Sequence, residues 1–225
     1  MSKYTRSSNY FEDKLKSLKR YTTRQEKEFL LLEDDVTYTE RLRVLSDVKP
    51  LNEYEAIALM FKLREISVSN IIELQKRCSC GSTNLYQINT AEFFNFNPEP
   101  ISGFEDLPVG LFFGLDDVIN TKITDDMIIR DYNKLEKDLL DRSVKIFKLN
   151  TTKICQKCGN DIVIDINPVH IMSKSNPASI YKEYLNISFY TNNSKLCIDS
   201  MYPFEREIYI GLLNEKLEQE PNMNF

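Results

Sequence analysis

The chain has 225 residues, of which 42% are hydrophobic, and this is enough to bury the core of one large domain or two small ones. Its formal net charge of -5 argues against a protein whose whole surface binds nucleic acid. No apolar run approaches the length of a membrane span, and residues 1–8 lack the apolar segment of a secretory signal. We therefore expect a globular protein in a reducing compartment, where cysteines favour metal binding or burial over disulfides.

The N-terminal part of the chain, residues 1–69, is predicted to be a helical region. From residue 10 to residue 33 the apolar side chains recur mostly at helical spacings, with a break near Thr22 and Thr23. This pattern predicts a short amphipathic segment followed by a helix. A further short helix or loop is expected at residues 39–44.

A longer helix is predicted at residues 54–64. Asn52 can accept backbone N–H bonds at its start, and the side chain of Glu55 can reach back to complete the cap. Apolar residues cover a wide arc of this segment. That is typical of a helix buried in a core rather than of a helix with a functional face.

Two later segments, residues 70–90 and 144–167, share one pattern: a strand, a turn that carries two cysteines, and a second strand. In the first segment, apolar and polar residues alternate up to Cys78, a polar turn covers residues 81–84, and residues 85–88 form the outgoing strand. The second segment repeats this order. The sequence therefore predicts two cysteine-tipped β-hairpins that are distant along the chain.

The remaining segments separate or follow these hairpins. Residues 91–143 are predicted to be an insert, with an irregular stretch rich in Phe, Pro and Gly before a helix at about residues 124–141. Residues 168–225 are predicted to start with a looser stretch and to end in a helix from Pro203 to about Glu218. Together these elements predict an α+β fold, with helical N- and C-terminal elements around a small zinc-ribbon-like pair of β-hairpins with a helical insert.

Four of the five cysteines form two pairs, one on each predicted hairpin turn: Cys78, Cys80, Cys155 and Cys158. Zinc prefers four tetrahedral ligands, and two thiolates at short spacing on a tight turn supply two of them. A glycine follows each pair and lets the backbone turn back towards the sulfurs. The second pair has the usual C-x-x-C-G spacing, whereas the first pair is one residue shorter. We expect one shared structural zinc ion that is closed by four cysteines and fastens the hairpins together.

Other interpretations of the cysteines stay open from sequence alone. One is that they are unliganded thiols on two unrelated turns. A redox C-x-x-C site fits less well, because that chemistry places the motif at the start of a helix and a strand is predicted here. Cys197 lies between two apolar residues and is expected to be a buried small side chain. His170, the single histidine, is expected to be partly buried and satisfied rather than a fifth ligand or a general base.

The sequence shows no catalytic constellation. It contains no G-x-S-x-G, P-loop, G-x-G-x-x-G or H-E-x-x-H motif. Adjacent carboxylates at residues 34–35, 116–117 and 125–126 are typical of helix starts and solvated loops. We expect a protein that is not an enzyme and has no small-molecule substrate.

The passage from residue 53 into the first cysteine pair resembles the baseplate hub proteins of T4-type contractile-tailed bacteriophages. That family has a segment of the type FxKLRxxSVGxxIE between a helical region and a β-rich part. The similarity covers residues 22–94, and Ser69 stands where the family pattern has glycine. The matching positions are Phe61, Leu63, Arg64, Ser67 and Val68, with Phe61 one position closer to Lys62 than the family pattern places it.

This resemblance implies a structural component of the virion tail baseplate, assembled in the host cytoplasm, that binds other phage hub and tail proteins and performs no catalysis. One alternative is a hub assembly chaperone that is absent from the mature virion. Another is a zinc-ribbon protein that binds nucleic acid. The acidic balance and the lack of interleaved basic and aromatic residues around the hairpins argue against that alternative. An enzyme is a weaker alternative, and no membrane contact is expected.

Overall fold

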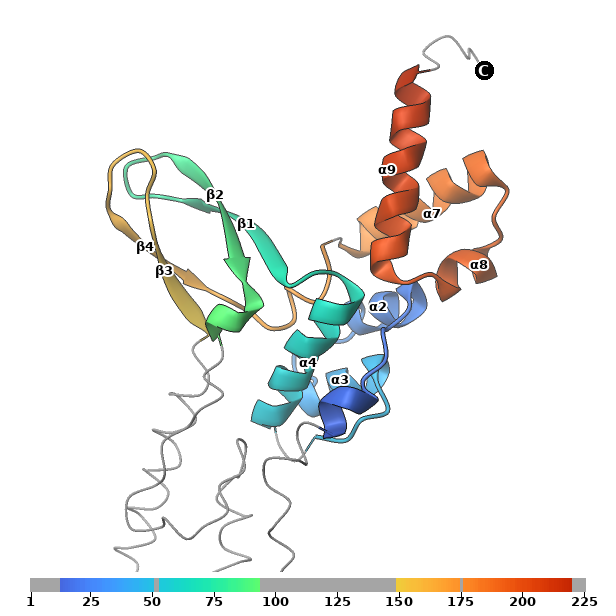
Figure 1. Cartoon of the computed structure of the whole chain (residues 1–225), viewed down its shortest axis with the longest axis horizontal. Helices are drawn as coiled ribbons and strands as arrows, with labels where there is room; N and C mark the ends of the chain where they lie inside the picture. The colour runs from blue at the N-terminus through green and yellow to red at the C-terminus, as the bar shows by residue number, and fades with distance from the viewer. Residues whose placement is uncertain (1–12, 51–52, 94–148, 175, 220–225) are drawn as a thin grey trace, which may run out of the picture.

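The computed structural model describes residues 13–50, 53–93, 149–174 and 176–219, and within them helices combine with two antiparallel hairpins. The predicted α+β class is confirmed. The hairpins lie together on one side, the N-terminal helices lie in the middle, and the C-terminal helices lie on the other side (Figure 1). The elements are, in chain order, α2 (Thr23–Leu30), α3 (Tyr38–Leu45), α4 (Glu53–Ser67), β1 (Ile71–Arg77), β2 (Thr83–Asn89), the 3₁₀ helix η1 (Thr90–Phe93), β3 (Asn150–Ile154), β4 (Asp161–Asp165), α7 (Pro177–Thr191), α8 (Lys195–Ser200) and α9 (Pro203–Gln219).

The helices α2 and α3 begin where side chains can cap them. Thr22 accepts the backbone N–H of Gln25, and the Gln25 side chain accepts the N–H of Thr22 in return. Thr37 and Glu40 form the same reciprocal cap on α3. The predicted break near Thr22 is therefore the start of α2, and the predicted short helix after it is α3. The expected cap at Asn52 and the insert helix at residues 124–141 lie outside the described residues.

The helix α4 is buried over most of its surface, as predicted, and its last turn is the junction with the hairpins. The buried side chain of Arg64 donates to the carbonyl oxygens of Ile71 and Ile171, at 2.7 Å each. A third bond goes to the carbonyl of Ser69. Burial lowers the pKa of this guanidinium. One side chain thus joins the end of α4 to the start of β1 and to the chain that follows β4.

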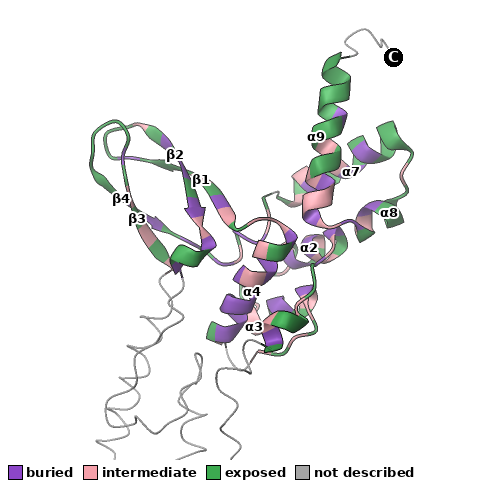
Figure 2. Ribbon diagram, viewed as in Figure 1, coloured by how far each residue is buried: buried purple, intermediate pink, exposed green. Residues whose placement is uncertain are grey.

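The two hairpins form separate two-stranded sheets. β1 pairs with β2 from Ile71–Asn89 to Arg77–Thr83, and β3 pairs with β4 from Asn150–Asp165 to Ile154–Asp161. β2 begins two residues before the predicted strand, so that Asn84 belongs to a strand and not to the turn. Buried residues from both hairpins join the same core as α2, α3 and α4 (Figure 2). Because a single two-stranded hairpin is marginally stable in water, each hairpin depends on the other and on this helical core.

The prediction of a looser stretch after the second hairpin is wrong, because α7 and α8 occupy much of it. Asn176 accepts the N–H of Ser179 at 2.9 Å and Pro177 occupies the first turn, so α7 has a clear start signal. Its apolar residues lie on two faces rather than one, which obscures the helical period in the sequence. The predicted C-terminal helix is confirmed as α9. Among the described residues, no helix combines the length and apolar character that a membrane span requires.

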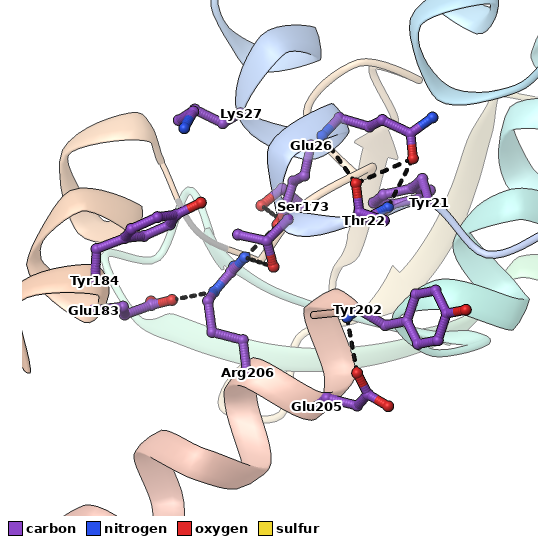
Figure 3. Close-up of polar contacts among 12 residues, drawn as sticks. Tyr21, Thr22, Glu26, Lys27, Ser173, Glu183, Tyr184, Tyr202, Glu205 and Arg206 are labelled. Carbon is purple, nitrogen blue, oxygen red and sulfur yellow. Dashed lines mark hydrogen bonds and ion pairs between the residues drawn. The ribbon is translucent and has the colours of Figure 1, made fainter. Parts of the chain in front are cut away.

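A buried polar network fastens α9 to α2 (Figure 3). The guanidinium of Arg206 lies 2.6 Å from the carboxylate of Glu26 and 2.6 Å from that of Glu183, and it donates to the Thr23 hydroxyl at 2.9 Å. Burial alone lowers the pKa of Arg206, but the two carboxylates outweigh it and the pKa is raised. Glu26 also accepts a hydrogen bond from Ser173, so the network reaches the chain after β4.

Candidate metal centre

The two cysteine pairs lie on neighbouring hairpin tips, and their four sulfur atoms lie within 4.8 Å of one another. The Sγ atoms of Cys78 and Cys158 are 3.6 Å apart, and those of Cys80 and Cys155 are 3.8 Å apart. All four thiols are free, and these distances exceed the about 2 Å of a disulfide. A tetrahedron with metal–sulfur bonds of about 2.3 Å has edges of about 3.8 Å. The four sulfurs therefore have the spacing of a tetrahedral metal site, and the two turns are not unrelated.

The first cysteine turn is closed by backbone hydrogen bonds. The N–H of Cys78 donates to the carbonyl of Ser82 at 2.8 Å, and the N–H of Gly81 donates back to the carbonyl of Cys78 at 2.9 Å. Gly81 has a φ of 84°, in the left-handed region that glycine adopts without strain. The glycine after the first pair thus permits the reversal that aims both sulfurs to one side.

The second turn is built in the same way with one more residue between its cysteines. The N–H of Cys155 donates to the backbone carbonyl of Asn160 at 2.8 Å, and the N–H of Gly159 donates to the backbone carbonyl of Cys155 at 2.9 Å. Gly159 has a φ of 77°. The shorter spacing of the first pair is therefore no obstacle to a shared site. Each turn contributes one buried and one exposed cysteine: Cys78 and Cys155 are buried, and Cys80 and Cys158 are exposed. The cysteine cluster therefore lies at the hairpin turns and is partly open to solvent.

Two polar side chains from the first hairpin surround the sulfurs, and the sequence analysis did not identify either of them. The Ser82 hydroxyl lies 3.0 Å from the Sγ of Cys80 and 3.2 Å from that of Cys155. The buried Asn84 amide nitrogen lies 3.6 Å from the Sγ of Cys155, and its oxygen accepts the N–H of Gln156 at 3.0 Å. In the sequence, Asn84 could have been recognised as a polar residue that shares the inward face of a strand with the apolar Tyr86 and Ile88.

The thiols of the cluster differ in their pKa values. Hydrogen bonds from the Ser82 hydroxyl and from backbone N–H groups lower the pKa of Cys155 to about 5. The backbone N–H of Asn160 lowers the pKa of Cys158, but partial desolvation of its sulfur and the neighbouring cysteine sulfurs together outweigh it and raise that pKa to about 12. The first thiolate therefore forms readily and further thiolates are opposed by the charge already present. A divalent cation is the group that relieves this repulsion.

Contacts away from the sulfurs also join the hairpins. The Tyr86 hydroxyl, at the middle of β2, donates at 3.1 Å to the carbonyl of Ile154, the last residue of β3. Lys153 of β3 and Glu92 of η1, the 3₁₀ helix that follows β2, form an ion pair at 2.9 Å. Both contacts hold β3 beside the first hairpin without a metal. The cysteine turns are therefore partly positioned by protein contacts alone.

Two sequence-based expectations about other residues are wrong. Cys197 lies on α8 and is exposed, because the apolar contact of this short helix is made by Ile198. His170 is exposed rather than partly buried, and it lines a cleft of about 620 Å³ together with residues of α3 and α4. His170 is not among the residues that converge on the sulfurs.

Comparisons of the chain with protein-family models, with curated proteins and with solved structures find no match.

Proposed function

We propose that this chain is a non-enzymatic structural subunit of a phage tail baseplate hub, in which one structural zinc ion fastens two β-hairpins. The observation that carries the zinc part is the tetrahedral spacing of four cysteine sulfurs from two hairpins. Thiolates are the preferred ligands of zinc in structural sites. Four protein ligands fill a tetrahedral shell and leave no position for a water or a substrate, so the ion would act by joining chain segments.

The sheet topology gives a physical reason for an ion that joins the two hairpins. In the described part of the chain the hairpins share no hydrogen-bonded strand pair, and their tips are the parts of the hairpins farthest from α4 (Figure 1). The tip contacts that the structure records are the polar ones around Ser82 and Asn84 and the close approach of the sulfurs. A bound ion would add four strong bonds at that point, and its binding energy would contribute directly to folding stability.

The hub part of the proposal rests on the sequence resemblance, and the structural roles of the matching residues support it. Phe61 and Leu63 are fully buried in the core, and Arg64 binds the carbonyls of Ile71 at the start of the first hairpin and of Ile171 after the second hairpin. The Ser67 hydroxyl accepts the N–H of Tyr21 at 3.2 Å. The shared segment therefore carries the packing that sets the hairpins on the helices. A resemblance made of such core residues supports a common scaffold, and the hub function is carried over from the family by analogy with that scaffold.

Metal analysis of the purified full-length chain tests the zinc part. We expect about one zinc per chain by elemental mass spectrometry, and substitution with cobalt should give the absorption of a tetrahedral thiolate site. Cys158→Ser should lose the metal and lower the melting temperature. Cys197→Ser, at an exposed cysteine outside the cluster, should change neither. Iron in place of zinc, or a metal-free chain with wild-type stability, contradicts this part.

Quantitative mass spectrometry of purified phage particles tests the hub part separately. A hub subunit should be present in fixed proportion to other tail proteins. Absence from mature particles, despite expression in infected cells, would contradict the subunit and support an assembly chaperone. Since this measurement does not depend on metal content, the two parts of the proposal can fail independently.

A further inference from the structure

Large apolar side chains are exposed mainly on the three C-terminal helices. Among the described residues, nine of the fifteen exposed large hydrophobic side chains lie on α7, α8 and α9. The apolar cluster between these helices is small and consists of four buried residues with two partly buried neighbours, of which Leu30 belongs to α2. The nine are Tyr181, Leu185, Phe189, Tyr190, Leu196, Ile208, Tyr209, Leu212 and Leu217. A concentration of exposed apolar groups of this kind marks an interaction surface.

The helix α7 has the clearest pattern. Its inner face is formed by Ile180, Tyr184 and Ile187, which are buried against the neighbouring helices. A second row consists of Tyr181, Leu185 and Phe189, which are 49%, 71% and 68% exposed. These three residues are spaced by four, so they form one ridge along the helix surface. A helix with apolar residues on two faces is suited to burial on both.

This outer ridge is complementary to a copy of itself. Leu185 lies at its centre and one aromatic residue lies four positions away on each side. A two-fold axis through Leu185 would place Tyr181 beside Phe189 of the second copy, and ridges at a spacing of four residues pack well against each other. The only charged residues of α7 are Lys182 and Glu183, so two copies of this helix meet without net repulsion although the chain carries a charge of -5.

We propose that the outer ridge of α7, formed by Tyr181, Leu185 and Phe189, is a self-association surface that pairs antiparallel with the same ridge of a second copy of this chain. At their exposed fractions these side chains offer on the order of 400 Å² per copy. A stable interface needs about 800 Å² per partner, of which the centre is apolar and the rim polar. The ridge therefore supplies the apolar centre, and the flanking polar residues of α7 supply the rim.

Sedimentation velocity of the full-length metal-loaded chain tests this inference. We expect a dimer at micromolar concentration, and Leu185→Glu should raise the dimer dissociation constant about thirtyfold or more. Leu85→Glu is the matched control, because Leu85 is 56% exposed on β2. It should leave the dimer intact. A wild-type chain that stays monomeric at about 100 µM, or equal effects of the two variants, would overturn the proposal.

A charge pair tests the antiparallel register and does not depend on one variant folding well. Tyr181→Glu and Phe189→Lys should each weaken the dimer, because each places a charge opposite an aromatic residue. The double variant should recover most of the lost affinity, since the two new charges face each other across the interface. A double variant that is weaker than both single variants overturns the antiparallel pairing. Helix content by circular dichroism verifies that every variant is folded.

Discussion

The side-chain oxygen of Asn84 accepts the backbone N–H of Gln156 at 3.0 Å, although the two residues are 72 positions apart. Asn84 belongs to β2, and Gln156 lies between the two cysteines of the second turn. The same amide group reaches the Sγ of Cys155 through its nitrogen. One buried side chain of the first hairpin therefore orients the second cysteine turn, and it does so through bonds that need no metal.

Asn84→Ala should weaken metal binding by about tenfold to a hundredfold, the usual effect of losing a group that orients a ligand. The loss arises because the second turn is no longer held in position and the Cys155 sulfur loses a donor. Competition with a chromophoric chelator measures the affinity. Gln87→Ala on the same strand is the control, because the Gln87 side chain is exposed and bonds only to Glu73 in the described structure. Equal affinities for both variants would show that Asn84 has no positioning role.

The network around Arg206 predicts a large difference between two ion pairs. Glu26→Ala should lower the free energy of unfolding by about 3–5 kcal/mol, because it leaves a buried guanidinium with one of its two carboxylates missing. Glu28→Ala removes the exposed pair with Arg24 and should leave the free energy of unfolding nearly unchanged, because solvent screens that pair. Urea unfolding followed by circular dichroism gives both values. Similar losses for the two variants would mean that α9 is not held by the buried pair.

The three carbonyl contacts of Arg64 make this residue sensitive to conservative change. Arg64→Met keeps much of the apolar stem but leaves three carbonyl oxygens without their donor. Each unsatisfied carbonyl costs about 1 kcal/mol or more, so the free energy of unfolding should fall by about 3 kcal/mol. Arg64→Lys should recover only part of it, because an ammonium does not reach all three oxygens. Arg43→Met, at an exposed position of α3, is the control and should be nearly neutral.

Tyr21 predicts a loss of stability at alkaline pH. Burial, and secondarily the charge of Glu26, raises the pKa of Tyr21 well above its usual value, and its hydroxyl donates to the carbonyl of Met172. Above about pH 10 the unfolded chain ionises this group and the folded chain does not. The free energy of unfolding should therefore fall by about 1.4 kcal/mol per pH unit from this residue alone.

Urea unfolding at several alkaline pH values measures that slope. Tyr21→Phe should be less stable than the wild type at neutral pH, since the Met172 carbonyl loses its donor, but its alkaline slope should be shallower. Tyr209→Phe serves as the control because Tyr209 is exposed on α9. A Tyr21→Phe variant with the wild-type slope would show that Tyr21 is not held neutral by the fold.

Local signals in the sequence were sufficient for the elements with a single clear period or cap. The break near Thr22, the buried α4 and the start of α9 at Pro203 follow from residue type and spacing, and the structure has each of them. Such signals are not sufficient for α7, because its second apolar ridge around Leu185 masks the helical period. They also mispredict Cys197, whose apolar neighbours along the chain indicate burial although the side chain is exposed.

Two cysteine pairs, each followed by glycine, are recognisable in the sequence as the tips of two hairpins, because turn chemistry is local. That the four sulfurs meet within 4.8 Å follows from the folded arrangement alone, since it depends on how α4 and Arg64 place the first hairpin beside the second. The roles of Asn84 and Arg206 likewise follow only from the folded structure. Asn84 bonds to Gln156 and Arg206 bonds to Glu26, and in both pairs the partners are more than 70 positions apart. No local pattern encodes such partners, because burial and long-range packing bring them together.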